Sequence, residues 1–600
     1  DRRVSVEPLR EADDGARARE IAEQGAVLLK NGGGLLPLSP GALHSIAVIG
    51  ADAPNASTQG GGAARVEPTY TVSPLDAIRA RAGGGVRVEW AEGTDPVMPA
   101  DLLPGPTPIP SSVLTPPGDP SVHGLKAEYW TNPGFEGAPD DVQIDREVAA
   151  SAGFFSYESV HAGSAPPLSP RYALTKFSAR WTGFLTAPAT GDYRLTLTSR
   201  GRGWVWLDGA LVIDHSDEHE LATRSATVHL AAGEAHALEV RYSADSPDIG
   251  VKVDLGGDVK LGWDMPPGAT TPAVRDAASL AARSDVAVVV VRDYGTEERD
   301  RPSLALPQAQ DELVRAVAAA NPRTVVVLTT GQPASMPWLD AVPAVLEAWY
   351  AGQEQGNAIA RILFGDVNPS GKLPITFPRT LDGTPFGGTP ASDGGTVGYA
   401  EGVLVGYRWY DASGVDPLLP FGFGLSYTTF RYDGLEVEPG PTARDASGTA
   451  RGRVSFTVTN TGERAGAEVA QVYVGTCSGA PDDPPKVLAG FAKVELAPGQ
   501  SARVSADVAP EALSRWDESG HAWQVPACAV PVQVASSSRD VRLVGWLQVS
   551  ADGSVAPAAA PSGGGCRQGP GGGAALAALL VAWLAARSVR RRRATRPARG

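Results

Sequence analysis

An apolar run of six residues, Val286 to Val291, constrains the fold of this chain more than any other stretch. It is too short to span a membrane and too apolar for an exposed strand, so it predicts a fully buried parallel strand. A helical stripe with Leu313, Val314 and Val317 follows it. In an open α/β sheet, ligands bind at the carboxyl ends of the strands. The intervening loop, with six charged residues between positions 293 and 301, is therefore our first candidate for a functional site.

The same alternation of strand, loop and helix occurs elsewhere in the chain. Further buried strands are predicted at 46–50, 324–329 and 344–349, and a helix is predicted over 16–31. Such repetition with short connections predicts a doubly wound α/β domain. We assign this domain to two separate pieces of the chain, residues 1–98 and 265–398.

The stretch between those pieces has a different pattern. A Pro-rich linker at 96–120 leads into residues 121–264, where short alternating apolar runs predict a β-sandwich. Because insertions are tolerated at exposed loops, we interpret this sandwich as inserted into the α/β domain. Trp204 and Trp206 are either core residues of it or an aromatic platform for sugar. The acidic and His-rich run at 214–219 indicates a solvated turn rather than a metal site, and no metal is predicted.

The rest of the chain predicts a connecting segment, a second sandwich and a tail. Residues 399–431 are rich in aromatic residues and glycine, which is typical of a segment that packs across a domain boundary. Residues 432–549 alternate again and predict a second β-sandwich. The tail begins with a linker rich in Gly, Pro and Ala at 550–573, which contains Cys566.

The end of the tail predicts a membrane anchor. The apolar segment 574–586 falls short of the ~20 residues of a comfortable span, so it would need its flanking glycines or a thinned bilayer. The Arg-rich segment 587–600 would stay cytoplasmic, which leaves residues 1–560 outside. We therefore expect an extracellular or cell-surface protein anchored at its C-terminus. The alternative is a solvated basic tail on a short helix.

Composition excludes several classes of function. The formal charge is −15, and because residues 561–600 hold eight arginines and no acid, residues 1–560 carry −23. Such an acidic body argues against nucleic-acid binding, which needs a basic surface. Three cysteines, Cys477, Cys528 and Cys566, are too few for a disulfide scaffold or a four-Cys zinc site.

The charged loop after residue 291 contains two adjacent carboxyls, Glu297 and Glu298. A general acid must stay protonated near neutral pH through burial or a neighbouring negative charge. Glycoside hydrolysis uses two carboxyls, about 5–5.5 Å apart for retention and about 6.5–9.5 Å for inversion. The loop could supply both carboxyls. The alternative is a solvated network of ion pairs on the surface.

The segment from Glu297 to Arg301, with Leu306-Pro307 and Gln310, resembles the E-G-x-D-R…L-P…Q segment of glycoside hydrolase family 3, the β-glucosidase and β-xylosidase family. Other motifs agree in order: V-L-L-K-N, I-A-V-I-G-A-D-A, A-G-Q-E-Q-G, N-P-S-G-K-L-P, E-G-V-L-V-G-Y-R-W-Y-D and P-F-G-F-G-L-S-Y-T. The last sandwich resembles the fibronectin type III-like domain of that family, the inserted sandwich a protective-antigen-type module, and the tail a myxobacterial sorting tail.

The resemblance implies roles for residues of the loop. Glu297 matches the acid/base glutamate, and Glu298 stands where the family has glycine. The added carboxylate would raise the pKa of Glu297 or crowd the loop. Asp300 and Arg301 would brace the loop by an ion pair rather than touch substrate. An extracellular location would allow Cys477 and Cys528 to pair, and Cys566 would be a processing or lipid-attachment site.

The nucleophile of that family is an aspartate on a (β/α)8 barrel, and no such motif occurs in these 600 residues. We therefore expect the chain to be the C-terminal part of an exo-acting retaining β-glycosidase, inactive alone, that works with a barrel domain upstream or in trans. The expected substrates are β-linked oligosaccharides or aryl and alkyl glycosides, and no cofactor is implied. The alternative is a non-catalytic carbohydrate-binding protein of the cell surface.

Overall fold

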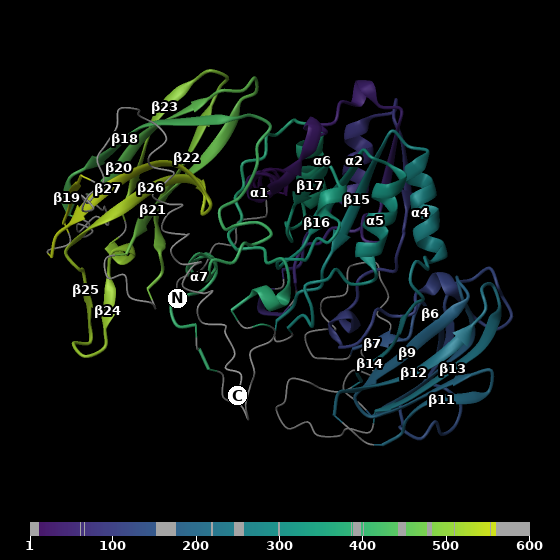
Figure 1. Ribbon diagram of the computed structural model, residues 1–600. Helices are drawn as coiled ribbons and strands as arrows, with labels where there is room; N and C mark the ends of the chain where they lie inside the picture. The colour runs from purple at the N-terminus through teal and green to yellow at the C-terminus, as the bar shows by residue number, and fades with distance from the viewer. Residues whose placement is uncertain are drawn as a thin grey trace, which may run out of the picture. The chain divides into compact units, whose positions relative to one another are not determined.

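The computed structural model describes residues 11–60, 62–64, 66–151, 176–217, 220–244, 257–297, 300–385, 387, 398–399, 401–441, 452–476, 483–508, 510–551 and 554–559. Within these residues, helices cover a mixed sheet, and two further regions consist mainly of antiparallel strands (Figure 1).

A six-stranded sheet forms the centre of the α/β region. In spatial order its strands are β1 (Val27–Asn31), β17 (Ala344–Glu347), β16 (Thr324–Thr329), β15 (Val286–Arg292), β2 (Ser45–Ile49) and β3 (Arg87–Ala91). All neighbours pair in parallel except β1, which pairs antiparallel with β17 at one edge. The buried parallel strand predicted from residue 286 is confirmed, and it lies between β16 and β2.

Helices cover both faces of this sheet because the strands are apolar on both sides. The described α-helices are α1 (Glu11–Gly25), α2 (Pro74–Ala82), α4 (Pro272–Ala282), α5 (Gln310–Ala320), α6 (Gln355–Leu363) and α7 (Tyr407–Ser413). Val288 of β15 lies in an apolar cluster that includes residues of α2 and α6. Its neighbour Val289 points to the other side and lies in a cluster that includes residues of α4 and α5. The period of two along the strand therefore builds two separate cores.

The helix predicted over 16–31 is wrong in its second half. Helix α1 ends at Gly25, and residues 27–31 form strand β1. Ile21, an apolar residue of α1, is 73% exposed. Leu28 instead faces the core from β1, which is fully buried at its first three positions. Pairing with β17 decides the conformation here, and the helical periodicity of the sequence does not report that pairing.

The inserted region is built from two sheets. The larger contains β4 (Leu114–Thr115), β5 (Leu125–Trp130), β6 (Asp141–Asp145), β8 (Phe177–Thr186), β10 (Arg202–Leu207), β11 (Ala210–His215) and β13 (Ala235–Ala244). The smaller contains β7 (Ala149–Ala150), β9 (Gly191–Ser199), β12 (Ala222–Leu230) and β14 (Val259–Asp264). One apolar cluster joins residues of both sheets. Trp204 and Trp206 are half-buried and alternate with the buried Val205, so their interpretation as core residues was wrong.

The C-terminal region has a three-stranded sheet of β18 (Phe430–Glu438), β20 (Arg453–Asn460) and β23 (Ser501–Asp507). A six-stranded sheet contains β19 (Gly440–Pro441), β21 (Gly466–Gly475), β22 (Lys486–Leu496), β26 (Cys528–Ser537), β27 (Asp540–Val549) and β28 (Ser554–Pro557). A separate hairpin is formed by β24 (Arg515–Asp517) and β25 (Ala522–Gln524). One apolar cluster again contains residues of both larger sheets.

Several predictions about the tail and the cysteines lie outside the described residues. They concern Cys477, Cys566 and the segments 574–586 and 587–600. Cys528 is disulfide-bonded. None of the described helices combines the length and the apolar character that a membrane span requires. The cell-surface location and the anchor therefore stay predictions.

Candidate active site

The charged loop leaves the carboxyl end of β15, and a glutamine holds this strand end in place. The side chain of Gln310, at the start of α5, accepts a hydrogen bond from Arg292 N at 2.9 Å and donates to Arg292 O at 2.8 Å. It also donates to Pro307 O at 2.8 Å. The last strand residue and the first helix residue are thus joined directly, which sets where the loop begins and where it ends.

Asp293 is the first loop residue, and its side chain is fully buried. Its Oδ1 accepts hydrogen bonds from the Tyr350 hydroxyl at 2.5 Å and from Gly331 N at 3.0 Å. Its Oδ2 accepts from Arg301 Nη1 at 2.9 Å. Buried carboxylates are stable only when paired and hydrogen-bonded, and both oxygens of Asp293 meet that condition.

Tyr350 connects this carboxylate to the loop backbone. Its hydroxyl accepts a hydrogen bond from Gly295 N at 2.9 Å while donating to Asp293. The Arg292 guanidinium lies 5.9 Å from the centre of the Tyr350 ring, within the range of a cation–π contact. Burial, followed by the charge of Asp293, raises the pKa of the Tyr350 hydroxyl, which keeps it a donor.

Glu297 lies further along the loop, and its side chain is exposed. One oxygen, Oε2, accepts a short hydrogen bond from the backbone N–H of Ala63. The other, Oε1, makes no hydrogen bond to any residue that the structure describes. The loop after β2, which contains Gly60 and Ala63, therefore contacts the candidate acid itself. Glu298 lies outside the described residues.

The two residues predicted to brace the loop differ in their surroundings. Arg301 is 7% exposed and pairs with Asp293, and it also donates to the carbonyls of Pro333 and Ala305 at 3.1 and 3.3 Å. Asp300 is exposed. The ion pair at this loop thus joins its last residue to its first.

A second buried carboxyl, Glu347, lies at the same sheet edge at the end of β17 and is fully buried. It accepts hydrogen bonds from Trp349 N at 2.8 Å and from the Thr330 hydroxyl at 2.9 Å. Desolvation raises the pKa of Glu347 to about 8, and its hydrogen bonds only partly oppose that rise. Glu347 therefore holds its proton at neutral pH.

The sequence placed Asp293 in the charged loop but gave it no role, and it did not single out Tyr350 or Glu347. Glu347 ends β17, and Asp293 and Tyr350 lie just beyond β15 and β17, so the rule that ligands bind at carboxyl ends could have indicated all three. Gln355 is a further case. Its side chain accepts from Ser57 N at 2.7 Å and donates to Trp349 O at 2.7 Å, which explains the second glutamine of A-G-Q-E-Q-G.

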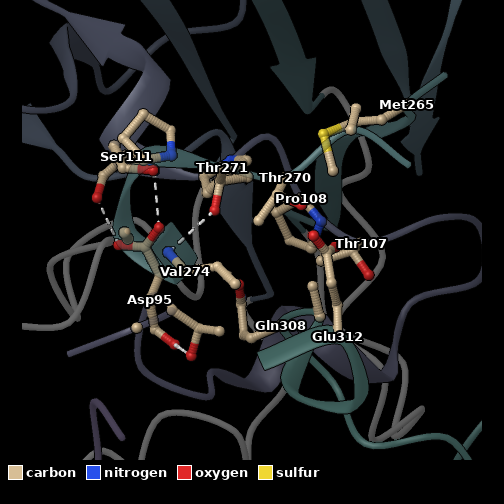
Figure 2. Close-up of a pocket in the computed structure, with 18 of the residues that line it drawn as sticks. Asp95, Thr107, Pro108, Ser111, Met265, Thr270, Thr271, Val274, Gln308 and Glu312 are labelled. Atoms are coloured by element: carbon tan, nitrogen blue, oxygen red, sulfur yellow. Dashed lines mark hydrogen bonds between the residues drawn. The ribbon is translucent and has the colours of Figure 1, made fainter. Parts of the chain in front are cut away.

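A cavity of about 830 Å³ lies elsewhere, beside the starts of α4 and α5. Figure 2 shows Asp95 hydrogen-bonded to Ser111 on one side of it, and Met265 and Thr107 on the other. Burial raises the pKa of Glu312, which also lines it. Glu297 does not line this cavity, so the cavity and the charged loop are separate sites.

A metal centre is not indicated in the part of the chain that the structure covers, where no three His, Cys, Asp or Glu side chains could hold an ion together. In the run at 214–219, Glu218 and His219 lie outside the described residues. In Glu297 the loop offers an exposed carboxyl at the carboxyl end of a parallel strand, with one of its oxygens held by a backbone amide. Such a group can transfer a proton to or from a bound substrate.

Comparison with known proteins identifies the family. Residues 26–427 match the glycosyl hydrolase family 3 C-terminal domain. The chain belongs to glycosyl hydrolase family 3. Residues 468–538 match the fibronectin type III-like domain, so both predicted resemblances are confirmed. The assignments of the insert and of the tail stay predictions.

Curated relatives named as β-glucosidases agree with this result. The chain is 35% identical over 551 residues to a β-glucosidase of Rhizobium radiobacter, covering 88% of this chain and 62% of the relative. It is 35% identical over 567 residues to a probable β-glucosidase K of Emericella nidulans, covering 91% and 64%. The chain thus spans somewhat over six tenths of the length of these relatives.

Solved structures of β-glucosidases show the same fold. A β-glucosidase from Kluyveromyces marxianus in complex with glucose superposes with a TM-score of 0.58 at 32% identity, covering 90% of this chain and 62% of that one. A β-glucosidase from Streptomyces venezuelae in complex with D-glucose gives a TM-score of 0.61 at 33% identity, covering 91% and 61%.

Proposed function

We propose that this chain supplies the general acid/base of an exo-acting retaining β-glycosidase that hydrolyses terminal β-linked glucose, and that Glu297 is the group. The observation that carries the proposal is the place of Glu297 in the motif of the family. The motif lies at the carboxyl edge of a parallel sheet, with the glutamate exposed and its loop held by buried hydrogen bonds. The names of the relatives support a β-glucoside as substrate.

In the proposed first step, Glu297 protonates the glycosidic oxygen as a carboxylate nucleophile attacks the anomeric carbon. The leaving alcohol departs, and a covalent glycosyl–enzyme intermediate forms. In the second step Glu297, now ionised, removes a proton from water, which attacks the same carbon and releases the sugar with its configuration retained. The Ala63 amide donates to only one oxygen of Glu297, Oε2. The other oxygen is therefore available to give up the proton in the first step and to accept one in the second. We expect the nucleophile from a barrel domain upstream or in trans.

The test uses the full chain, alone and with a barrel domain of the family added in trans. Turnover of 4-nitrophenyl β-D-glucoside is expected to be negligible alone and measurable with the barrel. With the barrel present, Glu297→Ala should lower kcat/KM at least ~100-fold, the lower range for a lost general acid/base. 2,4-Dinitrophenolate leaves with less help from a general acid. With the 2,4-dinitrophenyl glucoside, the variant should therefore lose less of its rate in the first step. Added azide should restore turnover and yield the β-glucosyl azide.

The matched control is Glu234→Ala, which removes an exposed glutamate from a turn of the inserted region. It should hydrolyse both substrates like the unchanged chain. Equal activity of Glu297→Ala and the unchanged chain on the nitrophenyl substrate would exclude Glu297 as the acid/base. Glu297-dependent turnover by the chain alone would instead place the nucleophile within these 600 residues.

A further inference from the structure

Both ends of the loop that carries Glu297 meet at one buried carboxylate. Asp293 starts the loop, and Arg301 ends it with a 2.9 Å hydrogen bond to Asp293 Oδ2. The ion pair is almost wholly enclosed, with the two side chains 0% and 7% exposed. A buried pair of this kind resists separation because losing one partner leaves an uncompensated charge. The pair therefore fixes the distance between Asp293 and Arg301, the two ends of the loop.

The other oxygen of Asp293 acts on the middle of the loop. Tyr350 donates to Oδ1 at 2.5 Å and accepts from Gly295 N at 2.9 Å, so one hydroxyl links the carboxylate to the backbone two residues before Glu297. Gly331 N donates to the same oxygen at 3.0 Å and anchors it to the end of the neighbouring strand β16. This carboxylate thus accepts hydrogen bonds from three different segments, and together these bonds fix its position.

The loop after β2, which contains Gly60 and Ala63, also packs against the loop that carries Glu297. A Cβ on Gly60 would lie 2.5 Å from Gly295 O, and one on Gly331 would lie 2.8 Å from Cε2 of Tyr350. Only glycine allows the backbone at position 60 to come this close to Gly295, and the backbone at position 331 to come this close to the Tyr350 ring. The close approach at Gly60 brings the N–H of Ala63 onto Glu297 Oε2.

We propose that Asp293, acting through Tyr350 and Arg301, is the positioning residue for Glu297. Asp293 is fully buried and cannot touch substrate, so its effect reaches the acid/base only through the loop backbone. The inference rests on the proposed function for its catalytic meaning. The contacts that define the position of the loop can be tested without any substrate.

The first experiment is hydrogen exchange on the full chain, read at the amides of Gly295 and Ala63. Tyr350→Phe removes one hydroxyl and keeps the ring. Asp293→Asn weakens the contacts of this side chain with both Tyr350 and Arg301. We expect exchange at both amides to quicken about tenfold or more in Tyr350→Phe, with other core amides unchanged. The matched control is Tyr129→Phe, which deletes the equivalent tyrosine–aspartate hydrogen bond to Asp145 in the inserted region. It should leave both amides protected.

The second experiment separates positioning from stability. With the barrel added in trans, Tyr350→Phe should lower kcat by about tenfold while KM changes less than twofold, at a temperature where both proteins are folded. Asp293→Glu, which keeps the charge, should recover more activity than Asp293→Asn. If the amides of Gly295 and Ala63 exchange as slowly in Tyr350→Phe as in the unchanged protein, the inference is wrong. Full activity of Glu297→Ala would overturn the proposed function and leave the exchange result standing.

Discussion

At the scale of single residues, two buried carboxyls at the carboxyl ends of the strands are stabilised differently, one by a cation and the other by keeping its proton. Asp293 has a guanidinium partner in Arg301. The hydrogen bonds that Glu347 accepts come instead from neutral groups, the Thr330 hydroxyl and the Trp349 amide. Burial without a cation favours the protonated form, which is why the pKa of Glu347 rises to about 8.

This difference predicts a pH dependence of stability. Because Glu347 binds its proton more tightly in the folded protein, its stabilising contribution is full below its ordinary pKa of 4.5 and is lost as pH rises through about 8. Each pKa unit corresponds to about 1.4 kcal/mol. Glu347→Gln mimics the protonated acid, so its Tm should fall less than that of the unchanged protein between pH 5 and pH 8. A Glu234→Gln control should follow the unchanged protein, and parallel curves for all three would contradict the prediction.

At the scale of elements, the junction of β15 and α5 depends on Gln310. This side chain, 4% exposed, satisfies both polar groups of the Arg292 backbone. Gln308 and Ala309 before it adopt left-handed backbone conformations, with φ of 57° and 55°. Such conformations are unfavourable for residues with a Cβ and persist where surrounding contacts hold them.

We predict that Gln310→Ala destabilises the α/β region by about 1–3 kcal/mol, the cost of leaving a buried amide unsatisfied. The loss should appear as a lower urea midpoint, with a larger effect on exchange of the Arg292 amide than on strands of the C-terminal region. Arg315→Ala, an exposed change on the same helix, is the control and should shift the midpoint little. An unchanged midpoint in Gln310→Ala would show that water can replace the glutamine.

At the scale of the whole molecule, buried acids lie where the inserted region meets the α/β region. Gln308 donates to Glu147 Oε1 at 3.0 Å and to Asp101 Oδ1 at 3.2 Å. Arg146 donates to Asp95 at 2.7 Å. Burial raises the pKa of Asp101 to about 6 and raises that of Glu147 well above its ordinary value. Burial also lowers the pKa of Lys260 beside them.

We predict that this contact loosens as pH rises. Two acids with raised pKa values stabilise the contact most at low pH, and the stabilisation is lost as pH rises through about 6 and above. Proteolysis within residues 96–120 should therefore quicken between pH 5 and pH 8, with protease activity normalised on an unfolded substrate. Glu147→Gln should reduce that change, whereas the exposed control Glu136→Gln should not. Equal pH dependence in all three proteins would rule out a role for Glu147.

Much of the fold was predictable because burial leaves a direct trace in composition. A strand covered on both faces must be apolar at every position, so the runs at 286–291 and 324–329 indicated their strands. Residues 27–31 had no such trace, since an edge strand with mixed burial also fits a helical period. The half-buried Trp204 and Trp206 illustrate the same difficulty, because alternation does not report which face is the core.

By itself the sequence determined the family, the parallel strands and the candidate acid Glu297. Motifs of contiguous residues indicate the family and the acid, and local runs of apolar residues indicate the strands. Only the tertiary structure decided what holds Glu297. Asp293, Gly331 and Tyr350 come from three segments that parallel pairing brings to one edge. The Ala63 amide reaches the same loop from more than 200 positions away. Hydrogen bonds between distant segments depend on how the strands are ordered in space, and local sequence carries no record of that order.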